Sequence, residues 1–148
     1  MEAVRIYEIP ACKMVVSGGG LFGDGVLEKF MEWMDSQKKS LFPRDFLSFD
    51  GQNFIWYYVY DEGMEVPDDL KIVDFEGGLY AVAAGRDGDD ADAQDAKRAI
   101  EEFIRMNPRF ERDCSRTELG NIITSPSAEA ALGYNQMDYY TPIRLKQD

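Results

Sequence analysis

The residues best suited to chemistry lie near the C-terminus, in the stretch GYNQMDYYTPIRL over 133–145. Side chains alternate between the two faces of a strand, and one set here is apolar and typical of a core: Met137, Tyr139, Ile143 and Leu145. The other set places a carboxylate and an amide between phenol rings: Tyr134, Gln136, Asp138 and Tyr140. Solvent-facing strand positions usually carry Lys, Glu or Thr, so we expect this second face to bind a ligand.

A second row of aromatic rings occupies alternate positions of the stretch FIWYYVY: Phe54, Trp56, Tyr58 and Tyr60. Aromatic faces stack on flat apolar ligands and attract cations, so this row is a candidate ligand wall. A strand buried on both sides would explain the same composition without any ligand. In the ligand-binding interpretation, the two aromatic rows line one cavity from opposite sides.

A second candidate carboxylate, Glu118, begins the strand-like stretch TELGNIIT. Beside an aromatic wall it would neutralise a ligand cation or act as a general base. The alternative is a solvated carboxylate at the start of a strand. The sequence has no histidine, which excludes Ser–His and Cys–His nucleophiles and most zinc sites. Cys12 and Cys114 match no metal-ligand spacing, and we expect neither a metal nor a cofactor.

Charge and hydropathy restrict the partners. Sixteen basic against 28 acidic residues give a formal charge of −12, which is poorly suited to binding a phosphate backbone. No apolar run approaches the roughly 20 residues that span a bilayer, and the N-terminus lacks the pattern of a signal peptide. We therefore expect a cytoplasmic protein that binds a small lipophilic or cationic ligand, with no direct contact to nucleic acid or membrane. The sequence does not indicate an oligomeric state.

The elements that must position these residues occur twice in the same order, strand, helix, strand, strand. The first repeat has strands over 4–18, 42–50 and 53–63, with a helix from Val26 to Met34. The second has strands over 70–85, 116–125 and 133–145, with a helix over 92–106 that Pro108 ends. We expect SPSAEAAL to be a plain connection between the last two strands.

The order of elements predicts an internal duplication within a single domain over 1–148, with repeat one at about 1–65 and repeat two at about 66–148. Met14 then aligns with Tyr80, and Val16 with Val82. The predicted fold class is α+β: an antiparallel sheet, two helices on one side of it, and a ligand groove at the pseudo-two-fold axis.

These residues resemble the GyrI-like small-molecule-binding domain, the effector-binding module of AraC-type and MerR-type multidrug-responsive transcription regulators. The likeness is carried by YEIPACKMVVSGGGLFG, PRDFLSFD, FIWYYVY, VDFEGGLYAVAAG and LGNIIT followed by GYNQMDYYTPI. It implies a groove between two repeats, with aromatic walls and a buried glutamate, that binds flat lipophilic and often cationic compounds. Glu118 is the nearest match to that glutamate, and Trp56, Tyr58 and Tyr140 match the wall. Asp138 is its rival, because Leu119 and Gly120 stand where the family has aromatic neighbours.

Three functions follow from these observations. The first is a ligand-binding domain that acts as a drug sensor or a sequestering protein; both expected helices belong to repeats, so neither is free to read DNA. The second is a hydrolase of lipophilic electrophiles, with Glu118 as base and Tyr140 or Tyr58 orienting the substrate. Some free-standing members of the GyrI-like family resemble such hydrolases. The third is a protein-interaction module with an exposed aromatic edge.

Overall fold

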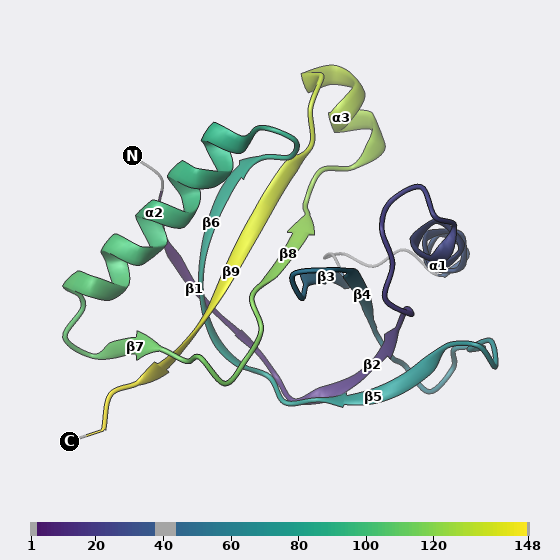
Figure 1. Ribbon diagram of the computed structural model, residues 1–148, viewed down its shortest axis with the longest axis horizontal. Helices are drawn as coiled ribbons and strands as arrows, with labels where there is room; N and C mark the ends of the chain where they lie inside the picture. Colours follow the sequence, from purple (N-terminus) through teal and green to yellow (C-terminus); the bar gives the residue numbers. More distant parts are fainter. Residues whose placement is uncertain (1–2, 38–43, 148) are drawn as a thin grey trace. The chain divides into compact units, whose positions relative to one another are not determined.

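The computed structural model describes residues 3–37 and 44–147, and the chain forms two compact units. Unit 1 comprises Met1–Ile9 and Gly78–Asp148, and unit 2 comprises Pro10–Gly77. The described residues contain nine strands and three helices, labelled in Figure 1. All strand pairs within each unit are antiparallel, which confirms the predicted α+β class.

Unit 2 is a four-stranded sheet in the order β3-β4-β2-β5. Its strands are β2 (Cys12–Val16), β3 (Asp45–Phe49), β4 (Phe54–Val59) and β5 (Lys71–Phe75), and its helix is α1 (Val26–Asp35). The glycine-rich turn before α1 has a clear structural role. Glu28 accepts hydrogen bonds from the backbone N–H groups of Gly23 and Gly25, and Gly25 has a positive φ of 95° that favours glycine.

Unit 1 repeats this arrangement in the order β8-β9-β6-β1, with a short strand β7 also pairing with β9. Its strands are β1 (Arg5–Ile9), β6 (Gly78–Arg86), β7 (Phe110–Arg112), β8 (Leu119–Ile122) and β9 (Gln136–Leu145), and its helices are α2 (Asp90–Met106) and α3 (Pro126–Leu132). The acidic run before α2 supplies its cap, because the Asp89 side chain accepts a hydrogen bond from the N–H of Asp92. Asp90 and Asp92 add favourable charge to the first turn.

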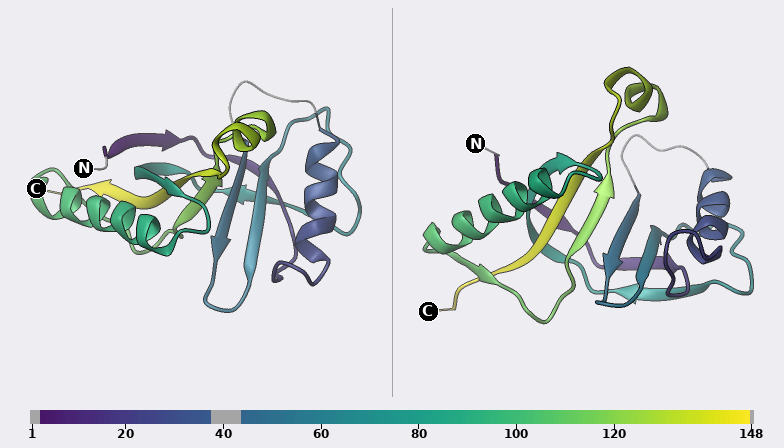
Figure 2. Two further views of the ribbon diagram at one scale, coloured as in Figure 1. Left: turned by 90° about the horizontal axis from the view of Figure 1, so that it is seen from above. Right: turned by 45° about the horizontal axis from the view of Figure 1, so that its top comes forward.

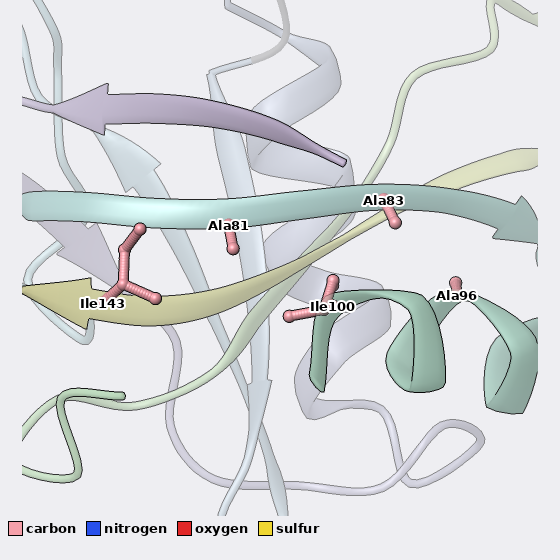
Figure 3. Packing of buried hydrophobic residues seen from close by; sticks show 5 residues of the cluster. All are labelled: Ala81, Ala83, Ala96, Ile100 and Ile143. Atoms are coloured by element: carbon pink, nitrogen blue, oxygen red, sulfur yellow. The ribbon is translucent and has the colours of Figure 1, made fainter. Parts of the chain in front are cut away.

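Helix α2 covers one face of the unit 1 sheet, along β6 and β9 in both views of Figure 2. Figure 3 shows the small residues Ala81 and Ala83 of β6 facing Ala96 and Ile100 of the helix, with Ile143 of β9 in the same cluster. All five side chains are buried. Alanine on the strand allows the helix to approach closely, so this face of the sheet forms one core cluster of unit 1.

The sequence predicts two helices, whereas the described residues contain three. SPSAEAAL, expected as a plain connection, forms α3, because Ser125 caps the N–H of Ala128, Pro126 occupies the first turn and Gly133 ends the helix in the left-handed conformation. Strand β7 was also not predicted. The strand expected over 42–50 is observed as β3, and residues 42 and 43 lie outside the described residues.

Each unit takes its edge strand from the other half of the sequence. Strand β1 precedes unit 2 in the chain but pairs with β6 of unit 1, and β5 pairs with β2 of unit 2. The compact units are therefore not the contiguous segments 1–65 and 66–148, although the order of elements repeats as predicted. In the described part of the chain no helix is long and apolar enough to cross a membrane.

Candidate functional site

The strongest candidate site is the face of the unit 1 sheet opposite α2, which we call the far face of unit 1. Cross-strand register assigns its residues. Tyr7 lies opposite Tyr80, Val82 opposite Tyr140, and Asn121 opposite Asp138. Because Ala81, Ala83 and Ile143 point to the helix, their neighbours along each strand point away from it. The buried and half-buried polar and aromatic residues of the far face are Arg5, Tyr7, Tyr80, Asn121, Asp138 and Tyr140. The same alternation also assigns Gln136 and its partner Arg86 to this face, where both are exposed.

Asp138 is the charged centre of the far face. Its side chain is only 4% exposed, and its Oδ1 lies 2.7 Å from Nη2 of Arg5, two strands away. The opposite position on the intervening strand β6 is Ala84, whose small side chain leaves room for the arginine to cross. The other terminal nitrogen of Arg5 donates a hydrogen bond of 2.7 Å to the Tyr7 hydroxyl. A buried carboxylate is tolerated when it is paired in this way.

Three tyrosine rings form a cluster on the same face, and Tyr140 is the one nearest to Asp138 in the chain. The ring centroid of Tyr140 lies 6.1 Å from that of Tyr7 and 5.9 Å from that of Tyr80. Burial, together with the nearby charge of Asp138, raises the pKa of Tyr140 well above its usual range, and a hydrogen bond with Asn121 offsets this only in part. Tyr140 therefore remains a neutral phenol at physiological pH and can donate a hydrogen bond.

Arg116 supports this face from the loop between β7 and β8. Its side chain is 8% exposed, forms an ion pair with Asp113, and donates hydrogen bonds to the backbone carbonyls of Leu79 and Ile143. Its guanidinium carbon lies 4.8 Å from the ring centroid of Tyr80. A Cβ at Gly78 would lie 2.5 Å from the Arg116 guanidinium, so glycine is required there for this contact.

The aromatic row predicted as a first ligand wall packs against α1 within unit 2. Tyr58 lies 5.5 Å from Trp33 between ring centroids, and Trp56 lies 6.3 Å from Phe30. Tyr60 belongs to the same cluster, and Phe54 contacts Phe22 and Phe49. The Trp56 indole also donates a hydrogen bond to Asp45, a carboxylate whose pKa burial raises. Helix packing therefore accounts for this row without a ligand.

Two other predicted site residues lie outside the strands that form the far face. Glu118 precedes β8, is half-exposed, and forms an ion pair with Arg112. Since Leu119 lies opposite Tyr140, alternation directs the preceding residue to the other side of the sheet. Tyr134 precedes β9 and its ring lies beneath the guanidinium of Arg86, with 4.5 Å between the ring centroid and Cζ. Of the predicted residues, the far face brings together Asp138 and Tyr140.

Sequence reasoning missed four residues of the far face: Arg5, Tyr7, Tyr80 and Asn121. One signal was available in β1, where Arg5 and Tyr7 alternate with Ile6 in the stretch RIYEI. Their relevance depends on the pairing of β1 with β6, which joins segments far apart in the chain and is not encoded in the local pattern.

Unit 2 also contains a cavity of about 350 Å³ beside the first turns of α1. Its apolar lining includes Val26, Phe30 and Leu70, and an ion pair of 2.8 Å between Lys29 and Asp69 lies at this cavity. Both charged side chains are largely exposed, so water already solvates them. This cavity is a rival location for a ligand, and it lacks a buried charge.

Comparison with known proteins identifies a shared fold. No family model matches the chain, and a search of curated proteins found no match. Among solved structures, EcmrR in complex with DNA matches with a TM-score of 0.66 at 8% identity, covering 97% of this chain and 57% of that one. The likeness is one of fold.

Two further structures match over nearly their whole length. The C-terminal domain of EcmrR has a TM-score of 0.62 at 10% identity, with 97% of this chain and 98% of that chain covered. The protein SAV2435 bound to tetraphenylphosphonium has a TM-score of 0.53 at 7% identity, with coverages of 96% and 94%. The present chain therefore has the fold of a separate domain of EcmrR and of a protein that holds a small aromatic ligand.

Proposed function

We propose that the protein is a small-molecule-binding domain whose ligand is lipophilic and aromatic and contacts the far face of unit 1. One observation carries the proposal: a buried carboxylate, Asp138, lies on the same face as Tyr140, whose ring contacts those of Tyr7 and Tyr80. Ligand sites combine apolar and aromatic surface with a few fixed polar groups in this way. Arg5 and Tyr7 are the partly exposed members of the face, and a ligand would reach it beside them.

The structural neighbours support the same class of function. SAV2435 binds tetraphenylphosphonium, a flat-ringed lipophilic ion, and EcmrR places a domain of this fold in a complex with DNA. We infer an effector-binding role of the GyrI-like kind, in a sensor or a sequestering protein of the cytoplasm. A net charge of −12 disfavours a direct DNA contact by these residues, so any regulatory output would pass through other residues or another chain.

The hydrolase hypothesis has less support. It requires Glu118 beside Tyr140 as general base, whereas Glu118 is paired with Arg112 and alternation directs it away from the far face. Asp138, the carboxylate that does lie near Tyr140, is paired with Arg5.

Isothermal titration with triphenylmethanol tests the proposal. We expect a dissociation constant on the order of micromolar, weakened at least fivefold by Tyr7→Leu, because a ring that stacks on the ligand is lost. Tyr134→Leu is the matched control, since it removes a half-buried tyrosine that precedes β9 and contacts Arg86 rather than the Tyr7, Tyr80 and Tyr140 rings. Equal weakening by both substitutions, or by neither, would contradict this location of the site.

A further inference from the structure

The buried carboxylate of the far face already has a cation. Nη2 of Arg5 lies 2.7 Å from Oδ1 of Asp138, with a side-chain exposure of 41% for the arginine and 4% for the aspartate. Arg5 thus lies on the solvent side of the pair. A second hydrogen bond to the Tyr7 hydroxyl, and a distance of 5.1 Å from Cζ to the Tyr7 ring centroid, hold the guanidinium in this position.

This pairing changes which ligands the face should prefer. A buried carboxylate without a partner strongly attracts a cation, because its desolvation is otherwise uncompensated. When an arginine of the same chain occupies that position, a cationic ligand must replace one ion pair with another and gains little. A neutral ligand does not need to displace the pair, so it meets no such cost.

A neighbouring amide points to the complementary chemistry. Asn121 is 4% exposed and lies opposite Asp138 in the β8–β9 register. The Asn121 amide forms a hydrogen bond with Tyr140, but within the described part of the chain its buried Oδ1 atom has no hydrogen-bond partner. Buried acceptors are nearly always satisfied, so a ligand with a hydroxyl or N–H group would complete this site.

We propose that Arg5 acts as the resident counter-ion of Asp138, so that the far face selects neutral aromatic ligands with a hydrogen-bond donor and discriminates against lipophilic cations. Removing Arg5 would convert the site to cation binding, and removing the Asp138 charge would convert it to anion binding. This inference rests on the proposed function, since it assigns a charge class to the ligand of the same face.

The test is a charge-exchange titration with three triphenylmethyl-type probes of similar size: triphenylmethanol, methyltriphenylphosphonium and triphenylacetate. Arg5→Met should bind the phosphonium at least tenfold more tightly than the wild-type protein, with triphenylmethanol changed less than threefold. Asp138→Asn should bind triphenylacetate at least tenfold more tightly, because its Arg5 then lacks a carboxylate partner. The two variants test the pair independently, so one remains informative if the other does not fold.

Lys13→Met is the matched control. It removes one positive charge from an exposed ion pair with Asp74 and so changes the net charge as Arg5→Met does, but in unit 2. Phosphonium binding by Arg5→Met no tighter than by Lys13→Met, while triphenylmethanol still binds, would overturn the counter-ion role and leave the proposed function standing. Absence of binding by all three probes in every variant would overturn both.

Discussion

The two units build similar sheets but use their far faces differently. Strand orders β8-β9-β6-β1 and β3-β4-β2-β5 correspond element by element. In each unit the helix comes directly after the third strand of this order in the chain: α2 follows β6, and α1 follows β2. In both units the helix covers an apolar cluster. The difference lies on the opposite face.

Cross-strand register identifies the equivalent positions of the two far faces. Val16 pairs with Tyr57 and Lys71 as Val82 pairs with Tyr140 and Arg5. Extending the register places these residues of unit 2 at the positions of Arg5, Tyr7, Tyr80, Asn121, Asp138 and Tyr140: Lys71, Val73, Met14, Ser48, Ile55 and Tyr57. Unit 2 has an isoleucine where unit 1 has its buried carboxylate.

The comparison separates what the fold requires from what it does not. The described residues of unit 2 form the same sheet, with Ile55 at the position of Asp138 and no buried ion pair there, so the Arg5–Asp138 pair is not a requirement of this architecture. Replacing a buried pair with apolar residues is often neutral or stabilising. We therefore attribute the Arg5–Asp138 pair to the proposed ligand site rather than to the stability of the sheet.

The largest expected effect concerns the aromatic row of unit 2, and it tests whether these rings stabilise the packing of α1 rather than bind a ligand. Trp56→Ala should lower the free energy of unfolding by about 3 kcal/mol, because a large ring is lost from the cluster under α1. Urea denaturation measures this loss. The affinity of the folded variant for triphenylmethanol should stay within about twofold of the wild-type value. A folded Trp56→Ala protein that no longer binds would place this row in the ligand site.

A second effect tests whether Arg116, which contacts the Tyr80 ring, stabilises unit 1. Arg116→Met should lower the free energy of unfolding by about 3 kcal/mol, since it leaves Asp113 and two strand carbonyls without this donor. Arg112→Met, which removes an arginine from a more exposed ion pair of the same unit, should cost less than about 1 kcal/mol. Equal losses in the two variants would refute the supporting role of Arg116.

The same loop should respond to acid. Hydrogen bonds from Ser115 and Arg116 lower the pKa of Asp113 from 3.8 to about 2. A lowered folded-state pKa contributes stability above the unfolded-state value, and this contribution is lost as pH falls from about 4 towards 2. Asp113→Asn should therefore show a shallower decline of melting temperature over that range. An identical acid profile in the two proteins would show that Asp113 does not titrate in this way.

The smallest effect concerns the half-buried carboxylate on the helix-covered side of unit 2. Burial raises the pKa of Asp45, although the indole N–H of Trp56 bonds to it. A raised folded-state pKa means that the charged form opposes folding at neutral pH, and the penalty disappears as pH falls below the unfolded-state value. Asp45→Asn should slightly raise the melting temperature at pH 7 and leave it unchanged near pH 3. A lower melting temperature at pH 7 would instead indicate that the Asp45 charge is stabilising.

Local patterns in the sequence were sufficient to predict most elements. Apolar spacing predicted α1 and α2, and alternation predicted β4 and β9. Helix α3 was missed although its signals are present: the cap at Ser125, Pro126 in the first turn, and Gly133 at the end. Strand β7 was missed because three residues carry too little periodicity to recognise.

The candidate site was harder to predict, because it depends on which face each helix covers. Trp56 and Asp138 both belong to alternating rows, but α1 covers the first row and α2 lies opposite the second. Arg5 enters the site through the pairing of β1 with β6, which joins the N-terminal part of the chain to its middle. Asp138 was kept as a rival to Glu118, and its burial beside Tyr140 now makes it the carboxylate we propose for the site.

The most direct test of the central claim is a two-dimensional amide NMR titration of the wild-type protein with triphenylmethanol. We predict the largest shifts at Tyr7, Tyr80, Asn121 and Tyr140, on the four neighbouring strands of unit 1. Shifts concentrated instead at Val26, Lys29 and Phe30, which line the cavity of unit 2, would contradict the account.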